Sequence, residues 1–176
     1  MKVFITMGIP GSGKSFFVNE SWRPDIEVIN PDRIRKMLTG SESDQTQNSR
    51  VFDLAHGRLR WLLLTSVEID GVRPNLRAVI FDATNVQKFA RQGLLDICAE
   101  FDAEPHLIVF DTPKQVCMER NRNRSRVVPD HAIKRMHGAF LEALDEIDSE
   151  GWASITTAGT EWDEVHGEML LTPHIG

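Results

Sequence analysis

Residues 8–15 constrain this chain more than any other feature of its sequence. They read Gly-Ile-Pro-Gly-Ser-Gly-Lys-Ser and match the pattern G-x-x-x-x-G-K-[ST] at every fixed position. An apolar run at residues 3–7 precedes them, as expected of a buried parallel strand. Glycines let the backbone curl so that successive N–H groups point inward, and a following helix adds the partial positive charge of its amino end. The segment is therefore predicted to bind phosphate groups between a strand and a helix.

The polar residues of this phosphate loop (P-loop, residues 8–15) have distinct expected roles. Lys14 is expected to reach the β and γ phosphates of ATP and to act in catalysis, and the Ser15 hydroxyl to bind magnesium. The residues predicted to bind ATP are Gly8, Gly11, Ser12, Gly13, Lys14 and Ser15. We therefore expect ATP, or another nucleoside triphosphate, as phosphoryl donor and Mg²⁺ as cofactor.

Strand and helix patterns alternate along the rest of the chain. Short apolar runs predict strands at residues 26–30, 78–81 and 106–110, and residues 152–157 are a candidate fifth strand. Helices are expected at residues 12–21, 32–38, 49–70, 87–101, 113–123 and 130–147, with a polar connection at 40–48. This alternation indicates an α/β fold, a P-loop NTPase-type parallel sheet with helices on both faces. We expect one domain over residues 1–176, with a core to about residue 157 and an acidic tail at 158–176.

Charge is spread unevenly along the chain. The formal net charge is −6, yet residues 114–135 hold seven basic and two acidic side chains. Residues 136–176 contain no Lys or Arg and nine Asp or Glu. A protein that coats nucleic acid is basic overall, whereas this pattern suits an enzyme that grips a few phosphates in a cleft.

The sequence also bears on where the protein works. No stretch approaches 18 consecutive apolar residues, so we expect no membrane span and no membrane partner. The two cysteines, Cys98 and Cys117, lack metal-ligand spacing and suit buried thiols in a reducing compartment. A cytoplasmic location is expected, in the host cell if a phage encodes the chain. The sequence makes no prediction about the oligomeric state.

Asp32 and Arg35 are the first candidates for the transfer chemistry. A kinase needs a base for the acceptor hydroxyl and positive charge near the transferring group. Asp32 lies just past the second predicted strand, at the sheet edge where sites form. Arg35 is one helical turn further, so a carboxylate for the hydroxyl and a guanidinium for a neighbouring anion would face one cleft. The alternative is an acidic first helical turn that favours the helix dipole, with a surface arginine.

A second group of candidates follows the third predicted strand. Asp82 ends that strand, and an acid at this place in a P-loop protein often contacts magnesium, directly or through water. Thr84 and Asn85 come next and are predicted to orient Asp82 or bind the acceptor. The alternative is a turn that uses the Asp side chain to cap its own backbone.

Four arginines alternate with polar residues before Pro129. They are Arg120, Arg122, Arg124 and Arg126. If the segment is helical, Arg120 and Arg124 share one face. An arginine-bearing lid that closes over ATP would present both to the β and γ phosphates, stabilise the transition state and exclude water. The alternative is the solvated basic end of a helix.

Taken in order, these residues resemble the polynucleotide 5′-kinase family, over about residues 2–152. The markers are the P-loop, Asp32 with Arg35, Asp82 with Thr84 and Asn85, and Arg120 with Arg124 before a long helix; the acidic tail departs from it. The resemblance implies phosphorylation of the 5′-hydroxyl end of DNA or RNA with ATP. It implies Asp32 as the general base, Arg35 as the group that binds the 3′-phosphate of the end nucleotide, and Arg120 and Arg124 as lid residues on the donor phosphates. It also implies that Asp82 and Thr84 lie near the acceptor or the magnesium shell, so that Arg35, Asp82, Thr84 and Asn85 are the predicted acceptor-binding residues.

Other acceptors stay open at this point. Related P-loop kinases phosphorylate a nucleotide sugar (zeta-type toxins), an antibiotic (chloramphenicol phosphotransferases) or a hydroxymethylated base within DNA. Arg35 favours an acceptor that already carries a phosphate beside the hydroxyl. An ATP-binding switch without an acceptor is a further alternative, and it predicts slow hydrolysis that no acceptor changes.

Overall fold

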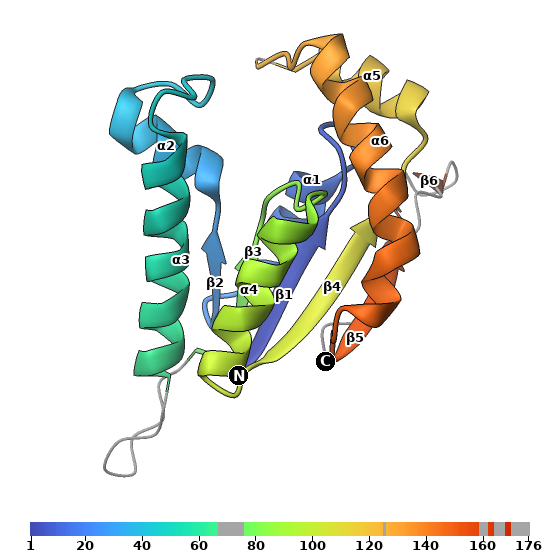
Figure 1. The fold of residues 1–176 in the computed structure, drawn as a ribbon. Coiled ribbons are helices and arrows are strands. Elements are labelled where there is room, and N and C mark those ends of the chain that lie inside the picture. The colour runs from blue at the N-terminus through green and yellow to red at the C-terminus, as the bar shows by residue number, and fades with distance from the viewer. Residues whose placement is uncertain (67–75, 125, 159–161, 164–167, 170–176) are drawn as a thin grey trace.

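The structure, a computed structural model, describes residues 1–66, 76–124, 126–158, 162–163 and 168–169. Its central sheet contains β1 (Lys2–Met7), β2 (Ile26–Ile29), β3 (Ala78–Phe81), β4 (Glu104–Phe110) and β5 (Ser154–Ala158) (Figure 1). The helices are α1 (Lys14–Ser21), α2 (Pro31–Thr39), α3 (Asn48–Thr65), α4 (Lys88–Glu100), α5 (Lys114–Arg122) and α6 (Asp130–Glu146), which a short 3₁₀ turn (Ile147–Ser149) follows. A separate antiparallel pair consists of β6 (Trp162–Asp163) and β7 (Glu168–Met169).

The five strands of the sheet lie in the order β2-β3-β1-β4-β5, and every neighbouring pair is parallel. Parallel neighbours require a crossover between them, which explains why helices alternate with strands along the chain. The predicted P-loop NTPase-type α/β fold is confirmed.

The strand register aligns the carboxyl ends of the strands. Phe81, the last residue of β3, pairs with Ile5 of β1 and with Ile29 of β2. On the other side of β1, Met7 pairs with Val109 of β4. The segments after these four strands, the P-loop among them, therefore leave the sheet at one edge, which is where ligand sites form in open parallel sheets.

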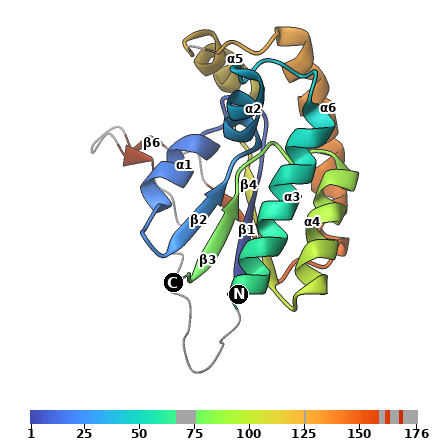
Figure 2. The ribbon, with the colours of Figure 1, turned by 90° about the vertical axis from the view of Figure 1, so that its left-hand side faces the viewer.

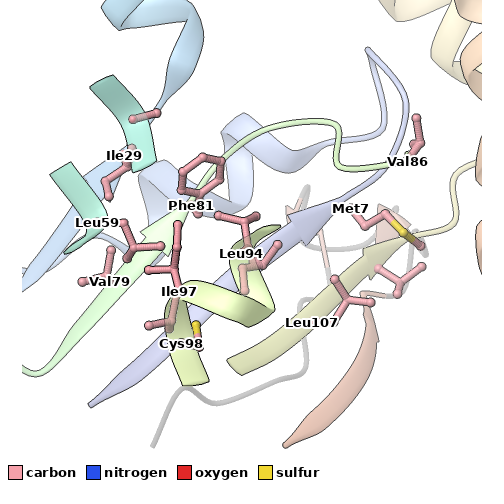
Figure 3. Packing of buried hydrophobic residues seen from close by; sticks show 14 of the residues in the cluster. Met7, Ile29, Leu59, Val79, Phe81, Val86, Leu94, Ile97, Cys98 and Leu107 are labelled. Atoms are coloured by element: carbon pink, nitrogen blue, oxygen red, sulfur yellow. The ribbon is translucent and has the colours of Figure 1, made fainter. Parts of the chain in front are cut away.

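Helices cover both faces of the sheet. α3, α4 and α6 pack on one face and α1 on the other (Figures 1 and 2). The larger core lies under the three helices and includes Leu59, Leu94 and Phe140; Figure 3 shows part of this packing. Phe17 and Val18 of α1 belong to the smaller core on the opposite face. Both faces are buried, as the near-continuous apolar strands predict.

Several boundaries differ from the sequence prediction. The first helix begins at Lys14, not residue 12, because Gly13 has a left-handed φ of 101°. The predicted helix at 49–70 ends at Thr65, and residues 67–70 lie outside the described residues. The candidate fifth strand is present as β5, and it includes Ala158, which was assigned to the tail. Whether residues 1–176 form one domain stays a prediction. Within the described residues, no helix is both long and apolar enough to cross a membrane.

Arg91 joins the segment after β3 to the carboxyl end of α6. Its side chain is fully buried and makes two contacts with Glu150, Nη2 to Oε1 at 2.6 Å and Nε to Oε2 at 2.8 Å. It also donates to the carbonyl oxygens of Val86 (2.9 Å) and Asn85 (3.3 Å). Glu150 is itself only 4% exposed. A buried ion pair of this kind fixes the position of both segments, because separating the two charges would leave each of them buried without a partner, at a high cost in free energy.

Replacing Arg91 should therefore be costly. Arg91→Leu leaves the buried Glu150 carboxylate unpaired, so we expect a loss of about 3–5 kcal/mol in the free energy of unfolding. Arg60→Leu is the matched control, because it breaks an exposed pair with Glu100 (3.0 Å) and should cost about 1 kcal/mol or less. Urea unfolding measures both. Equal losses in the two variants would contradict this assignment.

Candidate active site

The P-loop has the backbone shape that its sequence predicts. Gly11 and Gly13 take positive φ angles of 88° and 101°, a region that side chains other than glycine rarely adopt. Within the described residues, no side chain caps the amino end of α1, so its first N–H groups are available to phosphate oxygens. The Gly8 N–H donates to the carbonyl of Thr84 at 3.0 Å, which ties the loop to the segment after β3.

The P-loop also packs tightly against the start of α5. A Cβ on Gly11 would lie 2.3 Å from the carbonyl oxygen of Cys117, so only glycine fits there. The buried Thr112 hydroxyl donates to the Ser12 carbonyl at 2.9 Å. Neither Thr112 nor Cys117 was a predicted site residue. Their role is to hold the loop from the α5 side.

Lys14 extends across the P-loop. Its ammonium donates to the carbonyls of Gly8 (2.8 Å) and Ile9 (2.9 Å). Burial lowers the pKa of Lys14 to about 8; the charges of Asp82 and Asp32 act in the raising direction and Arg124 in the lowering direction. The pKa of Lys14 thus also depends on charged groups from three other segments: α2, the segment after β3 and the segment after α5.

Asp82 occupies the centre of this edge of the sheet. It is only 6% exposed, and its carboxylate accepts from the Asn30 amide (2.8 Å) and the Thr6 hydroxyl (3.3 Å). Asn85 is buried with a φ of 45°, and its amide donates to the Thr6 carbonyl at 2.8 Å. The Thr84 side chain is half-buried. Asp82 is thus oriented by β1 and by the end of β2, as a carboxylate toward magnesium would need to be.

Asn30 has two roles that the sequence only partly predicts. Its side-chain oxygen accepts from the Arg33 N–H (3.0 Å) and caps α2, with Pro31 at the first helical position. Its amide nitrogen meanwhile binds Asp82. The capping role follows from the sequence pattern, whereas the contact with Asp82 depends on the β2–β3 pairing.

Asp32 and Arg35 lie on α2 and form an ion pair, as their spacing predicts. Asp32 is half exposed, while Arg35 is only 4% exposed. The Arg35 Nη2 donates to Asn48 at 2.9 Å and its Nη1 reaches the carbonyl of Glu42 at 3.5 Å. Its Nε is buried and has no hydrogen-bond partner within the described residues. Arg35 is therefore a rigid, buried guanidinium, in contrast to the surface arginine of the alternative interpretation.

The lid segment comprises α5 and residues 123–129. Arg120, on α5, is half-buried and contacts the Gly11 carbonyl at 3.5 Å. α5 ends at Arg122, so Arg124 lies beyond the helix, and the two predicted lid residues do not share a helical face. The buried Asn121 accounts for this end, because its side chain pairs with both backbone groups of Val128 (2.8 and 3.0 Å) and draws the segment into a loop.

Arg126 contacts Asp32, an ion pair that the sequence did not predict. Its Nη1 lies 2.8 Å from Asp32 Oδ2 and 4.0 Å from Glu42 Oε2. In Figure 1 the amino end of α6 and the chain before it extend toward the side of the molecule where α2 lies. The arginine cluster was visible in the sequence, but nothing in it indicates which arginine meets Asp32.

The structure thus gathers the predicted site residues along one edge of the sheet. Ser15 is exposed in the first turn of α1, beside Lys14, and its hydroxyl is accessible to a metal ion. Mg²⁺ would supply charge neutralisation for the phosphates there, and the uncapped helix start, Lys14 and the oriented Asp82 fit such a group. The roles of the individual residues stay predictions.

A family model described as an AAA domain matches residues 3–143. The chain belongs to this AAA domain family. Every predicted site residue of this AAA domain, from Gly8 to Arg124, falls within the matched region.

Solved structures resemble this AAA domain as well. A chain of the Pnkp1/Rnl/Hen1 complex is 26% identical with a TM-score of 0.55, over 73% of this chain and 40% of that one. A chain of the AvrRxo1-ORF1:-ORF2 structure with ATP is 15% identical with a TM-score of 0.66, over 97% and 57%. A gluconokinase from Sinorhizobium meliloti is 17% identical with a TM-score of 0.51, over 89% and 81%.

The likeness to the last two structures shows the fold alone. This AAA domain spans 40% and 57% of the first two chains, less than two thirds of either. The family match and the 26%-identical chain together support a nucleotide-binding P-loop domain of the kinase type.

Gly11 offers a test of the P-loop geometry. Gly11→Ala should weaken both ATP binding and stability, because it forces a clash with Cys117 and a disfavoured φ worth roughly 1–2 kcal/mol. Gly57→Ala, within α3 and with open space around it, should instead stabilise by roughly 0.5–1 kcal/mol. Urea unfolding with and without ATP measures both effects. Similar behaviour of the two variants would rule out a constrained loop.

The pKa of Lys14 predicts a pH dependence of ATP binding. Burial holds this pKa near 8 in the free protein, and bound phosphates should raise it, so binding takes up a proton above about pH 8. The affinity for ATP should therefore fall between pH 8 and 9.5, by at most about tenfold per pH unit. Calorimetry in two buffers of different ionisation enthalpy measures the proton uptake. Lys14→Met should bind weakly and without this slope, and a flat wild-type profile would contradict the assignment.

Proposed function

We propose that this domain is an ATP-dependent kinase that phosphorylates the 5′-hydroxyl end of DNA or RNA. The observation that carries the proposal is the arrangement of charged groups at one edge of the sheet. Asp82 is held by Thr6 and Asn30, next to the segment that bonds the P-loop. The half-exposed Asp32 contacts Arg126, which follows α5. The pKa of Lys14, which burial lowers and which also depends on Asp82, Asp32 and Arg124, agrees with this arrangement.

The proposed reaction uses these residues in distinct roles. Lys14 and the α1 N–H groups would hold the phosphates of ATP, and Ser15 and Asp82 would hold Mg²⁺, which would neutralise phosphate charge there. Asp32 takes the proton of the acceptor hydroxyl while that oxygen bonds to the γ-phosphorus and the bond to the β-phosphate oxygen breaks. Arg120 and Arg124 stabilise the charge on the transferring group. The products are ADP and a phosphorylated 5′ end.

Arg35 is the residue we propose for acceptor recognition. Its buried Nε lacks a protein partner within the described residues, although Nη1 contacts Asp32 and the Glu42 carbonyl and Nη2 donates to Asn48. A buried unpaired donor is costly, and an acceptor phosphate would satisfy it. Thr84 and Asn85 are proposed to line the same acceptor region. An end nucleotide with a 3′-phosphate fits this arrangement, because its phosphate lies a short distance from the attacked hydroxyl.

The comparisons support this proposal to different degrees. The Pnkp1/Rnl/Hen1 chain is 26% identical, and this AAA domain covers 40% of it. The gluconokinase likeness, at 17% identity, concerns the fold. Small molecules and hydroxymethylated bases in DNA are accordingly alternative outcomes of an acceptor test.

The test of the proposed function is a panel of acceptors with labelled ATP and Mg²⁺. The panel holds 5′-hydroxyl DNA and RNA oligonucleotides, a nucleoside 3′-monophosphate, duplex DNA with hydroxymethylated bases, gluconate and water. The proposal expects transfer to the oligonucleotides and the 3′-monophosphate at rates far above hydrolysis. Transfer only to a small alcohol, only to the modified base or only to water would each replace it by the corresponding alternative.

Asp32→Asn tests the assignment of the base. The amide cannot take a proton, so we expect a loss of roughly 10²–10⁴-fold in kcat with ATP affinity retained. Asp25→Asn is the matched control, because Asp25 forms an exposed pair with Arg77 (3.4 Å) just before β2, at the end remote from the site. It should keep its activity. If the Asp32→Asn variant has the same kcat as the Asp25→Asn variant, Asp32 is not the general base and its role is confined to the first turn of α2.

A further inference from the structure

The ion pair between Arg126 and Asp32 bridges the lid segment and α2. The two residues are 94 positions apart in the chain (126 − 32), and the Nη1 to Oδ2 distance is 2.8 Å. Glu42 Oε2 lies 4.0 Å from the same nitrogen. Two carboxylates, that of the proposed base Asp32 and that of Glu42, therefore hold the Arg126 guanidinium.

Arg126 differs from Arg35 in what it can offer a ligand. Arg35 is 4% exposed and bonds three protein groups, while Arg126 is 24% exposed. Within the described residues, the ion pairs of Arg126 run through Nη1 alone. Its Nε and Nη2 are left to form the paired contact that a guanidinium makes with a phosphate.

The lid segment presents Arg126 in a defined position. The Asn121 side chain makes two hydrogen bonds with the backbone of Val128, two residues after Arg126. Asp32 has one oxygen on each guanidinium: Oδ1 on Arg35 and Oδ2 on Arg126. While Arg126 is paired with Asp32, the guanidinium occupies Oδ2 of Asp32. An acceptor hydroxyl that donates its proton to this oxygen would have to displace the guanidinium or bind beside it.

We propose that Arg126 is a specificity-determining residue that passes from Asp32 to the phosphate of the acceptor. This inference rests on the proposed function and adds a second guanidinium to acceptor recognition. An acceptor phosphate replaces Asp32 as the partner of Arg126, and the exchange frees Oδ2 to accept the hydroxyl proton. An acceptor without a phosphate leaves Arg126 on Asp32 and is a poor substrate for that reason.

The exchange predicts opposite effects on two acceptors. Arg126→Gln should lower kcat/KM for a nucleoside 3′-monophosphate by roughly tenfold, mainly through KM, because a charge-assisted contact is lost. It should raise kcat/KM for the plain nucleoside by up to about fivefold, because an exposed ion pair no longer occupies Asp32. Arg122→Gln is the matched control, since Arg122 is an exposed lid arginine that pairs with Asp130 (3.5 Å). It should leave the preference for the phosphorylated acceptor as it is.

Steady-state rates with both acceptors separate this inference from the proposed function. Wild-type transfer to neither acceptor would refute the proposed function and this inference together. If the wild type prefers the 3′-monophosphate and Arg126→Gln keeps that preference, only the inference fails. A parallel loss on both acceptors would make Arg126 a structural residue and would also overturn it.

Hydrogen exchange tests the ion pair without any acceptor. Arg126→Gln and Asp32→Asn should each speed the hydrogen exchange of the backbone amides at residues 126–128. The double variant should exchange no faster than either single variant, because both substitutions remove the same ion pair. Unchanged exchange in both single variants would show that the pair does not hold the lid segment in solution and would overturn the exchange mechanism.

Discussion

The buried carboxylate of Asp82 is the interaction on which the site depends. A carboxylate that is 6% exposed needs partners, and here the partners are Thr6 of β1 and Asn30 at the end of β2. Three strand ends are thus joined at one charged group. The P-loop follows β1 and α2 follows Asn30, so the position of both is set by the same contact. The register of the parallel sheet makes this possible, because it brings Ile5, Phe81 and Ile29 level.

From this centre the site extends in two directions. On one side lies Lys14, whose pKa burial lowers to about 8, with Arg120 reaching the P-loop from α5. On the other side lies Asp32, with one carboxylate oxygen on Arg35 and the other on Arg126. Arg120 and Arg126 both belong to the lid segment, so this one segment contacts both the P-loop and Asp32.

The sequence predicts the parts of this structure that local patterns determine. The P-loop, the strand ending at Phe81 and the cap of α2 follow from glycine spacing, apolar runs and an Asn-Pro pair. Local sequence patterns do not predict contacts between segments that are distant in the chain. The burial of Arg35 depends on how α2 packs on α3, and the pairing of Arg126 with Asp32 depends on where Asn121 turns the chain. The shared face of Arg120 and Arg124 depended on the helix continuing to Arg124, whereas α5 ends at Arg122 and the Asn121 side chain bonds to the backbone of Val128, seven residues away.

The central claim is that the γ-phosphoryl group reaches a 5′-hydroxyl beside a 3′-phosphate. The most direct measurement is phosphorus NMR of the product that the wild-type protein forms from ATP, Mg²⁺ and a nucleoside 3′-monophosphate. The account predicts a nucleoside 3′,5′-bisphosphate, with the new phosphate coupled to the protons at C5′. A new phosphate at any other position, or only ADP and inorganic phosphate, would contradict it.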